Sequence, residues 1–233
     1  NQISTLSFIC SLLGNISTIK HSAKDLSTKI RLLCGTMNYS INTYEKTNKE
    51  NQVYFKATFS TLEENEQEAL QLLVEILQES VFDQEKMIRD ILKQRIISLK
   101  QAITMSGHSL SMKRVLAMVS SSGVIDEYSS GIAYYKWLKE LDDHFDFVAL
   151  KQKLESVYQN VCFYNRLTLS FTGNDDTNLE KQALYLKETL KISDALEKAI
   201  IKPFSIKKEG IIIPSDIAYA SKGGYLLETS KIT

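Results

Sequence analysis

The segment "MSGHSLSMKRV" holds the side chains that most resemble a catalytic set, because His108 lies among Ser106, Ser109 and Ser111. Nucleophilic catalysis needs an imidazole within hydrogen-bond reach of a hydroxyl group, and a third group that orients the imidazole. Neighbouring side chains on a turn or helix point in different directions, and the chain has no GxSxG elbow. The segment therefore favours a helix break at Gly107, with Ser106 or Ser109 capping the next helix. A serine hydrolase centred on His108 stays open as an alternative.

Zinc hydrolysis would need histidines and a glutamate at helical spacing, as HExxH or HxxEH, so that both imidazoles lie on one helix face. The three histidines, His21, His108 and His144, are too far apart to form either motif. The three cysteines also lack the CxxC spacing of a zinc site and the density of a disulfide scaffold. We therefore expect no zinc site in this chain, and small apolar cysteines in a reducing compartment.

Composition excludes two further classes of partner. The 233 residues contain 28 Lys and Arg and 28 Asp and Glu, so there is no net field to attract nucleic acid or an anionic membrane. The longest apolar run, "EGIIIPS", is far shorter than the roughly 18 to 20 residues of a membrane span. We expect neither a nucleic-acid nor a membrane partner.

The apolar periodicity alternates between helix and strand. Two short helical segments, 7–16 and 25–35, come first; Ser22 caps the second, and Gly35 ends it in a left-handed conformation. Residues 36–44 and 52–59 alternate apolar and polar side chains, which predicts an antiparallel hairpin. Further helices are expected at 63–80, 83–103, 132–145, 150–157 and 178–190, a loop at 121–131, and strands at 163–171 and 211–221.

This order of elements predicts an α+β fold, in which helices cover an antiparallel sheet. Both prolines, Pro203 and Pro214, follow the last helix, and proline is excluded from helix interiors and central strands. We therefore expect a domain over residues 1–200, and a linker with the first strand of a following domain over residues 201–233.

Several segments together resemble one family, the pitrilysin/insulinase zinc metallopeptidases, in particular the second half of a presequence-protease-type member. They are "LLGNISTIKHSAKDLSTKI", "GTMNYSINTY", "MSGHSLSMKRVLAMVSSSGVIDEYSSGIAYYKWLKEL" and "IPSDIAYASKGGY". The resemblance covers nearly the whole chain in the same order. The positions that carry its most specific block are Gly107, His108, Arg114, Gly131, Tyr134 and Tyr135.

The resemblance implies a LuxS/pitrilysin-like metalloenzyme fold. In such peptidases four related domains in two halves enclose a chamber, the first domain carries an HxxEH zinc site, and the fourth supplies an Arg and a Tyr. This sequence looks like the third domain, which keeps the fold without the zinc site. Matching the first helix places the HxxEH positions at Phe8, Ser11 and Leu12, and the distal Glu within residues 90–93, where no histidine partners stand.

The predicted function is therefore that of an inert, chamber-forming domain of a zinc metalloendopeptidase that degrades peptides. Zinc would belong to the parent enzyme and not to this segment. Its partners would be the other domains of the same peptidase and unstructured peptides, in bacterial cytoplasm or in a eukaryotic organellar matrix. The alternative is a non-catalytic subunit that binds extended peptides along a sheet edge and works with a separate active chain.

Overall fold

The computed structural model describes residues 2–45, 51–173, 177–192, 201–213 and 216–224. In chain order the elements are α1 (Gln2–Leu12), α2 (Ala23–Leu33), β1 (Cys34–Glu45), β2 (Asn51–Thr61), a 3₁₀ turn (Glu63–Asn65), α3 (Glu66–Glu79), α4 (Glu85–Met105), α5 (Gly107–Leu116), α6 (Ser121–Ser130), α7 (Ile132–Asp143), α8 (Phe147–Tyr158), a second 3₁₀ turn (Tyr164–Arg166) and α9 (Thr177–Thr189). The fold is mixed α+β, as the sequence predicts.

The predicted hairpin is confirmed: β1 and β2 form a two-stranded antiparallel sheet. Met37 pairs with Phe59, and Tyr39 pairs with Ala57, so these apolar side chains share one face of the sheet. The opposite face is mostly polar and exposed, although Tyr44 and Tyr54 also lie on it, with ring centroids 5.5 Å apart. Its exposed residues include Thr36, Asn38, Ser40, Lys56, Thr58 and Ser60.

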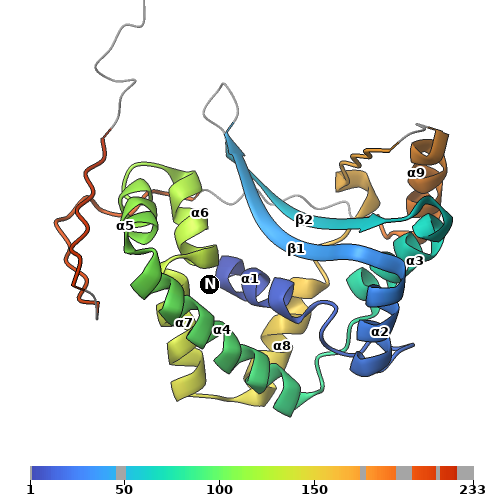
Figure 1. The fold of residues 1–233 in the computed structure, drawn as a ribbon, viewed down its shortest axis with the longest axis horizontal. Helices are drawn as coiled ribbons and strands as arrows, with labels where there is room; N and C mark the ends of the chain where they lie inside the picture. Colours follow the sequence, from blue (N-terminus) through green and yellow to red (C-terminus); the bar gives the residue numbers. More distant parts are fainter. Residues whose placement is uncertain (1, 46–50, 174–176, 193–200, 214–215, 225–233) are drawn as a thin grey trace, which may run out of the picture.

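The main hydrophobic core surrounds α1, which lies beneath the sheet and between α4, α7 and α8 (Figure 1). Phe8, Ile9 and Leu12 of α1 have no exposed surface, and neither have Leu92 of α4 and Leu138 of α7. A second cluster joins α3 to α9 and to the apolar face of β2. The sheet and the helices are therefore packed by the apolar stripes that the periodicity predicts.

The predicted loop at residues 121–131 is wrong, because α6 occupies Ser121–Ser130. Glycine and serine make this segment resemble a loop in the sequence. In the structure the Ser120 hydroxyl accepts a hydrogen bond from the Gly123 N–H, and Val124 and Ile125 are buried. N-capping and burial together outweigh a composition with low helix propensity.

Three other local predictions are also wrong. Gly35 does not end α2 in a left-handed conformation, because the chain turns directly into β1 at Cys34, whose φ is −124°. No strand forms within residues 163–171, where a 3₁₀ turn is followed by chain without regular structure. No strand is present in 211–213 or 216–221 either, while residues 214–215 and the proposed domain boundary near residue 200 lie outside the described residues.

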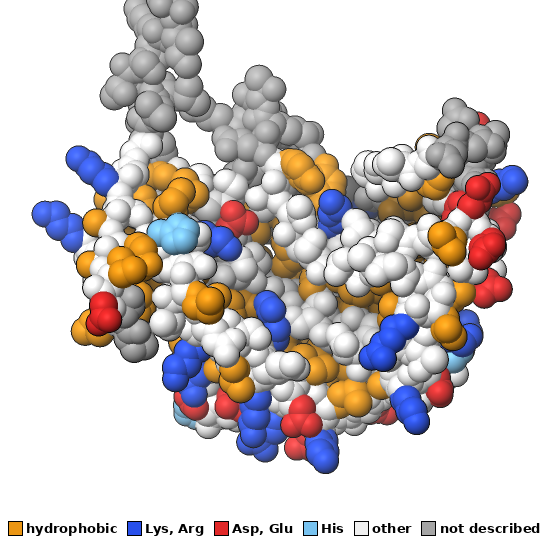
Figure 2. All heavy atoms as spheres, in the orientation of Figure 1, with side chains coloured by type: hydrophobic (Ala, Val, Ile, Leu, Met, Phe, Trp, Pro, Cys, Tyr) orange, Lys and Arg blue, Asp and Glu red, His pale blue; other side chains and the backbone are white. Residues whose placement is uncertain are grey.

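The charged side chains are mixed over the face of the molecule in Figure 2, as expected from the balanced composition. Among the described residues, no helix is both long enough and apolar enough to pass through a bilayer.

Candidate functional site

The segment around His108 forms a helix junction. Helix α4 ends at Met105 and α5 begins at Gly107, so Ser106 is the single residue between them. The predicted break is confirmed, but no serine side chain caps α5; the Ser106 carbonyl instead accepts a hydrogen bond from the Ser109 N–H at 3.0 Å. The junction thus relies on the backbone.

His108 faces an aromatic ring from the C-terminal part of the chain. The centroids of the His108 and Tyr219 rings are 5.8 Å apart. The Ser111 hydroxyl donates to the His108 carbonyl at 2.8 Å and also bonds the hydroxyl of Ser221 at 2.7 Å. Among the described residues no hydrogen bond joins the imidazole to a serine, so this geometry does not support a nucleophile and its base.

Arg114, on the last turn of α5, binds two carboxylates from different parts of the chain. Its Nε and Nη2 donate to the two oxygens of Glu209, at 2.6 and 3.1 Å, which is a bidentate pair. Its Nη1 donates to Oε1 of Glu127 on α6 at 3.1 Å. Hydrogen bonds from Arg114, with a further contribution from Lys207, lower the pKa of Glu209 from 4.5 to about 2. Glu209 in turn raises the pKa of Arg114.

Glu127 connects Arg114 to the start of α7. Its carboxylate has no exposed surface, and the same Oε1 accepts a hydrogen bond from the Ala133 N–H at 3.0 Å. Gly131 lies against it: a Cβ at that position would be 2.2 Å from Oε2 of Glu127. The glycine between α6 and α7 therefore leaves the space that the buried carboxylate fills.

The two tyrosines of the same block lie on α7, at the main core. Tyr134 has no exposed surface and stacks on Trp137 with a centroid distance of 6.0 Å. Burial raises the pKa of Tyr134 above its ordinary value of 10.0. Tyr135 is half-buried and packs against the same core. Both are packing residues in this structure.

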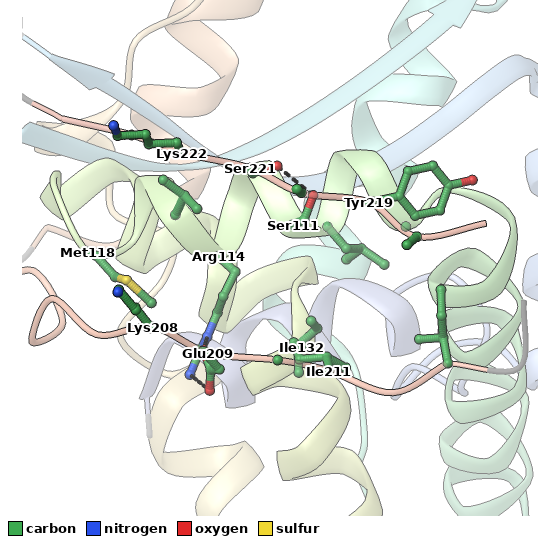
Figure 3. A pocket seen from close by; sticks show the side chains of 18 of the residues that line it. Ser111, Arg114, Met118, Ile132, Lys208, Glu209, Ile211, Tyr219, Ser221 and Lys222 are labelled. Atoms are coloured by element: carbon green, nitrogen blue, oxygen red, sulfur yellow. Dashed lines mark hydrogen bonds and ion pairs between the residues drawn. The ribbon is translucent and has the colours of Figure 1, made fainter.

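A cavity of about 1040 Å³ lies between α5 and the C-terminal segment. Figure 3 shows Arg114 and Ser111 reaching from α5 to Glu209 and Ser221 across it. Many of its lining side chains are aliphatic. They include Leu110, Val115, Met118, Ile132, Ile211 and Ile213.

The positions matched to HxxEH lie on α1, and two of them are in the core. Phe8 and Leu12 have no exposed surface, and Phe8 packs edge-on against Trp137 at 6.4 Å. Ser11 is half-buried, and its hydroxyl donates to the Ser7 carbonyl at 3.4 Å. Residues 90–93 lie on α4, where Leu92 belongs to the same core cluster as Phe8.

The histidines do not come together. His21 Nδ1 lies 2.7 Å from Oε1 of Glu75, and the Thr18 hydroxyl donates to that same oxygen. At the end of α7, His144 Nδ1 lies 3.3 Å from the carbonyl oxygen of Glu140. Among the described residues, no three His, Cys, Asp or Glu side chains are grouped so that they could hold a metal ion.

Sequence reasoning missed three carboxylates that organise the structure. Glu127 lies in the segment predicted as a loop, Glu209 lies in the predicted linker, and Glu75 lies within an amphipathic helix. A signal existed for Glu75 alone, because it falls among the apolar positions of α3 where a solvated carboxylate is not expected.

Two curated bacterial proteins are similar to this chain over most of its length. The chain is 24% identical to Protein HypA of Clostridium perfringens over 220 residues, which cover 93% of this chain and 23% of HypA. It is 26% identical to an uncharacterized protein of Borreliella burgdorferi over 227 residues, which cover 92% of this chain and 23% of that protein. The chain thus spans less than a quarter of the length of these curated relatives.

A family of peptidase-associated domains, those of peptidase family M16 (subfamily C), matches residues 1–141. That range includes α1, the hairpin, and the block from Gly107 to Tyr135. Because the match covers more than half of the sequence, the chain belongs to this peptidase-associated family.

Proposed function

We propose that the chain is a non-catalytic, chamber-forming domain of a zinc metalloendopeptidase that degrades peptides. Within the family it would correspond to the inactive third domain of a presequence-protease-type enzyme with a LuxS/pitrilysin-like fold. Residues 201–233 would lead toward the following domain. Membership of the peptidase-associated family and a length below one quarter of the relatives support this proposal.

The packing of α1 is the observation that carries the proposal. Phe8 and Leu12, the positions matched to the outer residues of HxxEH, are apolar and completely buried. Leu92, from the helix matched to the distal Glu, packs in the same cluster. A metal ion there would need desolvated ligands with lone pairs, whereas these side chains provide only dispersion contacts.

The polar face of the hairpin supports the role of a chamber wall. Asn38, Ser40, Thr58 and Ser60 are exposed on that face, and Lys56 is the charged residue among them. Short neutral side chains can hydrogen-bond to a peptide backbone without selecting for charge. Such a surface suits an enclosure for peptides of varied sequence.

The catalytic part of the proposal can be tested on the purified chain. We expect far less than one zinc per chain by elemental analysis after zinc loading and dialysis, and no cleavage of an unstructured fluorogenic peptide above a boiled control. Stoichiometric zinc, or cleavage that 1,10-phenanthroline abolishes, would refute the proposal.

The wall role needs the longer protein that carries this segment. A photoreactive amino acid at Thr58, on the polar face of β2, should cross-link a bound peptide substrate. The same amino acid at Lys93, an exposed residue of α4, serves as the matched control and should not. Equal cross-linking at both positions would contradict a chamber wall at the hairpin.

A second cavity favours the alternative, a peptide-binding subunit that works with a separate active chain. It has a volume of about 920 Å³ and lies between β2 and the segment 167–172. Phe55, Ala57 and Phe59 line it from the strand. An HxxEH motif upstream in the same reading frame would support the first proposal, and its absence the second.

A further inference from the structure

The C-terminal segment lies along α5 and is held there largely by side chains. We call residues 203–213 and 216–224 the strap. Near its start, the Phe204 N–H donates to the Ala117 carbonyl at 2.7 Å, and the Phe204 ring packs edge-on against Tyr128 at 5.5 Å. Near its end, Tyr219 and Ser221 contact the first turns of α5. The described part of the strap contains no helix or strand of its own.

Arg114 lies at the centre of these contacts. Its guanidinium group lies 5.0 Å from the Phe204 ring centroid, and it binds Glu209 through two hydrogen bonds. Only 14% of the Arg114 side chain and 20% of the Glu209 side chain are exposed. Lys207 also lies 3.2 Å from Glu209. The pair is thus partly desolvated, which makes it stronger than a surface ion pair.

The two carboxylates that bind Arg114 differ in how they are fixed. Glu127 is completely buried and is part of helix α6, and its carboxylate also accepts a hydrogen bond from the Ala133 N–H. Glu209 lies on chain without regular structure. Opening the contact with Glu209 therefore leaves the contact with Glu127 in place, whereas breaking the contact with Glu127 would leave a buried charge unpaired.

We propose that Arg114 is the latch of a detachable strap. Its Nη1 remains on Glu127, while Nε and Nη2 hold or release Glu209, and release of Glu209 opens the 1040 Å³ cavity beneath the strap. Detachment exposes the aliphatic surface formed by Leu110, Val115 and Ile132. The inference rests on these contacts and is independent of the proposed peptidase role.

Limited proteolysis of the full chain tests the latch. Chymotrypsin cleavage after Tyr219 is followed by intact mass spectrometry. Its rate reports the fraction of molecules in which the strap is detached, because a protease cleaves a locally opened segment in proportion to the population of the open form. Glu209→Gln removes one charge of the bidentate pair, and we expect cleavage to become about tenfold faster. Asp216→Asn is the matched control: it removes the same charge from an exposed strap position that has no ion pair among the described residues. We expect no change there.

Two further measurements separate a latch from a general loss of stability. Arg114→Lys keeps the charge beside Glu127 but loses the planar fork, so it should also accelerate cleavage after Tyr219. Raising the salt concentration should accelerate cleavage of the wild type and leave Glu209→Gln nearly unchanged, because screening acts on the ion pair. Cleavage after buried Tyr134 should stay slow throughout.

The proposal is overturned if Glu209→Gln leaves the rate after Tyr219 unchanged, or if Asp216→Asn raises it equally. It is also overturned if cleavage after Tyr134 rises in the same proportion, since that pattern means global unfolding.

Discussion

At the scale of single residues, Glu127 shows how a buried charge constrains its neighbours. Arg114 compensates its charge, and the Ala133 N–H completes the hydrogen bonding of Oε1. Gly131 gives the carboxylate its space. These positions lie close together in the sequence, but Glu127 and Gly131 belong to a serine-rich segment that was predicted as a loop, so periodicity could not predict their connection.

Gly131→Ala should destabilise the chain by about 1–3 kcal/mol, because its Cβ would overlap Oε2 and approach the Glu127 Cα to 2.8 Å. The backbone itself tolerates alanine, since the φ of Gly131 is −96°. Urea unfolding measures the change in the free energy of unfolding. Gly210→Ala is the control, as nothing lies within 4 Å of its added Cβ, and it should change stability by less than about 0.5 kcal/mol. Equal effects at both glycines would contradict the packing argument.

Glu75 should make stability depend on pH in the acid range. Burial alone would raise its pKa, but hydrogen bonds from His21 and Thr18, with Lys20 nearby, lower it below 4.5 overall. A depressed pKa means that the carboxylate stabilises the fold above its ordinary pKa, and that this contribution is lost as the pH falls below 4.5 toward the folded value. Between pH 6 and pH 3, the melting temperature of Glu75→Gln should fall less than that of the wild type. A parallel loss in both proteins would show that another group is responsible.

At the scale of elements, periodicity predicted the hairpin and the long helices because their apolar residues are numerous and regularly spaced. Residues 163–171 alternate just as clearly, yet form no strand. Leu169 still packs against the second core cluster. Leu167, another apolar position of the same alternation, is exposed. A strand requires a backbone partner in register, and sequence pattern does not encode that partner.

Helix α6 depends on its N-cap, because its composition favours a loop. Ser120→Ala removes the acceptor for the Gly123 N–H and should cost about 1 kcal/mol. Chemical unfolding, followed by far-ultraviolet circular dichroism, provides the measurement. Ser121→Ala changes the neighbouring serine, which has no side-chain hydrogen bond among the described residues, and should have little effect. If both substitutions cost the same, the cap does not stabilise α6.

At the scale of the whole molecule, the three cysteines report on packing. Burial raises the pKa of Cys10 to about 12 and that of Cys162 to about 11, and it also raises the pKa of Cys34. Because the thiolate is the reactive form, labelling by iodoacetamide at pH 8 should be at least about tenfold slower in the folded chain than in guanidinium chloride. Mass spectrometry of the labelled peptides identifies each site. A cysteine that reacts at its unfolded rate would contradict the packing around it.

The α+β class, the hairpin, the helix break at Gly107 and the family could all be predicted from the sequence, because each depends on local pattern or on an ordered set of motifs. The roles of those motifs became clear only from the packing of the helices. The tertiary structure placed Phe8 and Leu12 in a dry core, Glu127 beneath Gly131, and Glu209 on Arg114. The Arg114–Glu209 pair joins residues 95 positions apart, and Phe8 contacts Trp137 over a still longer separation in the sequence. Burial and charge pairing over such separations arise only when the helices have packed.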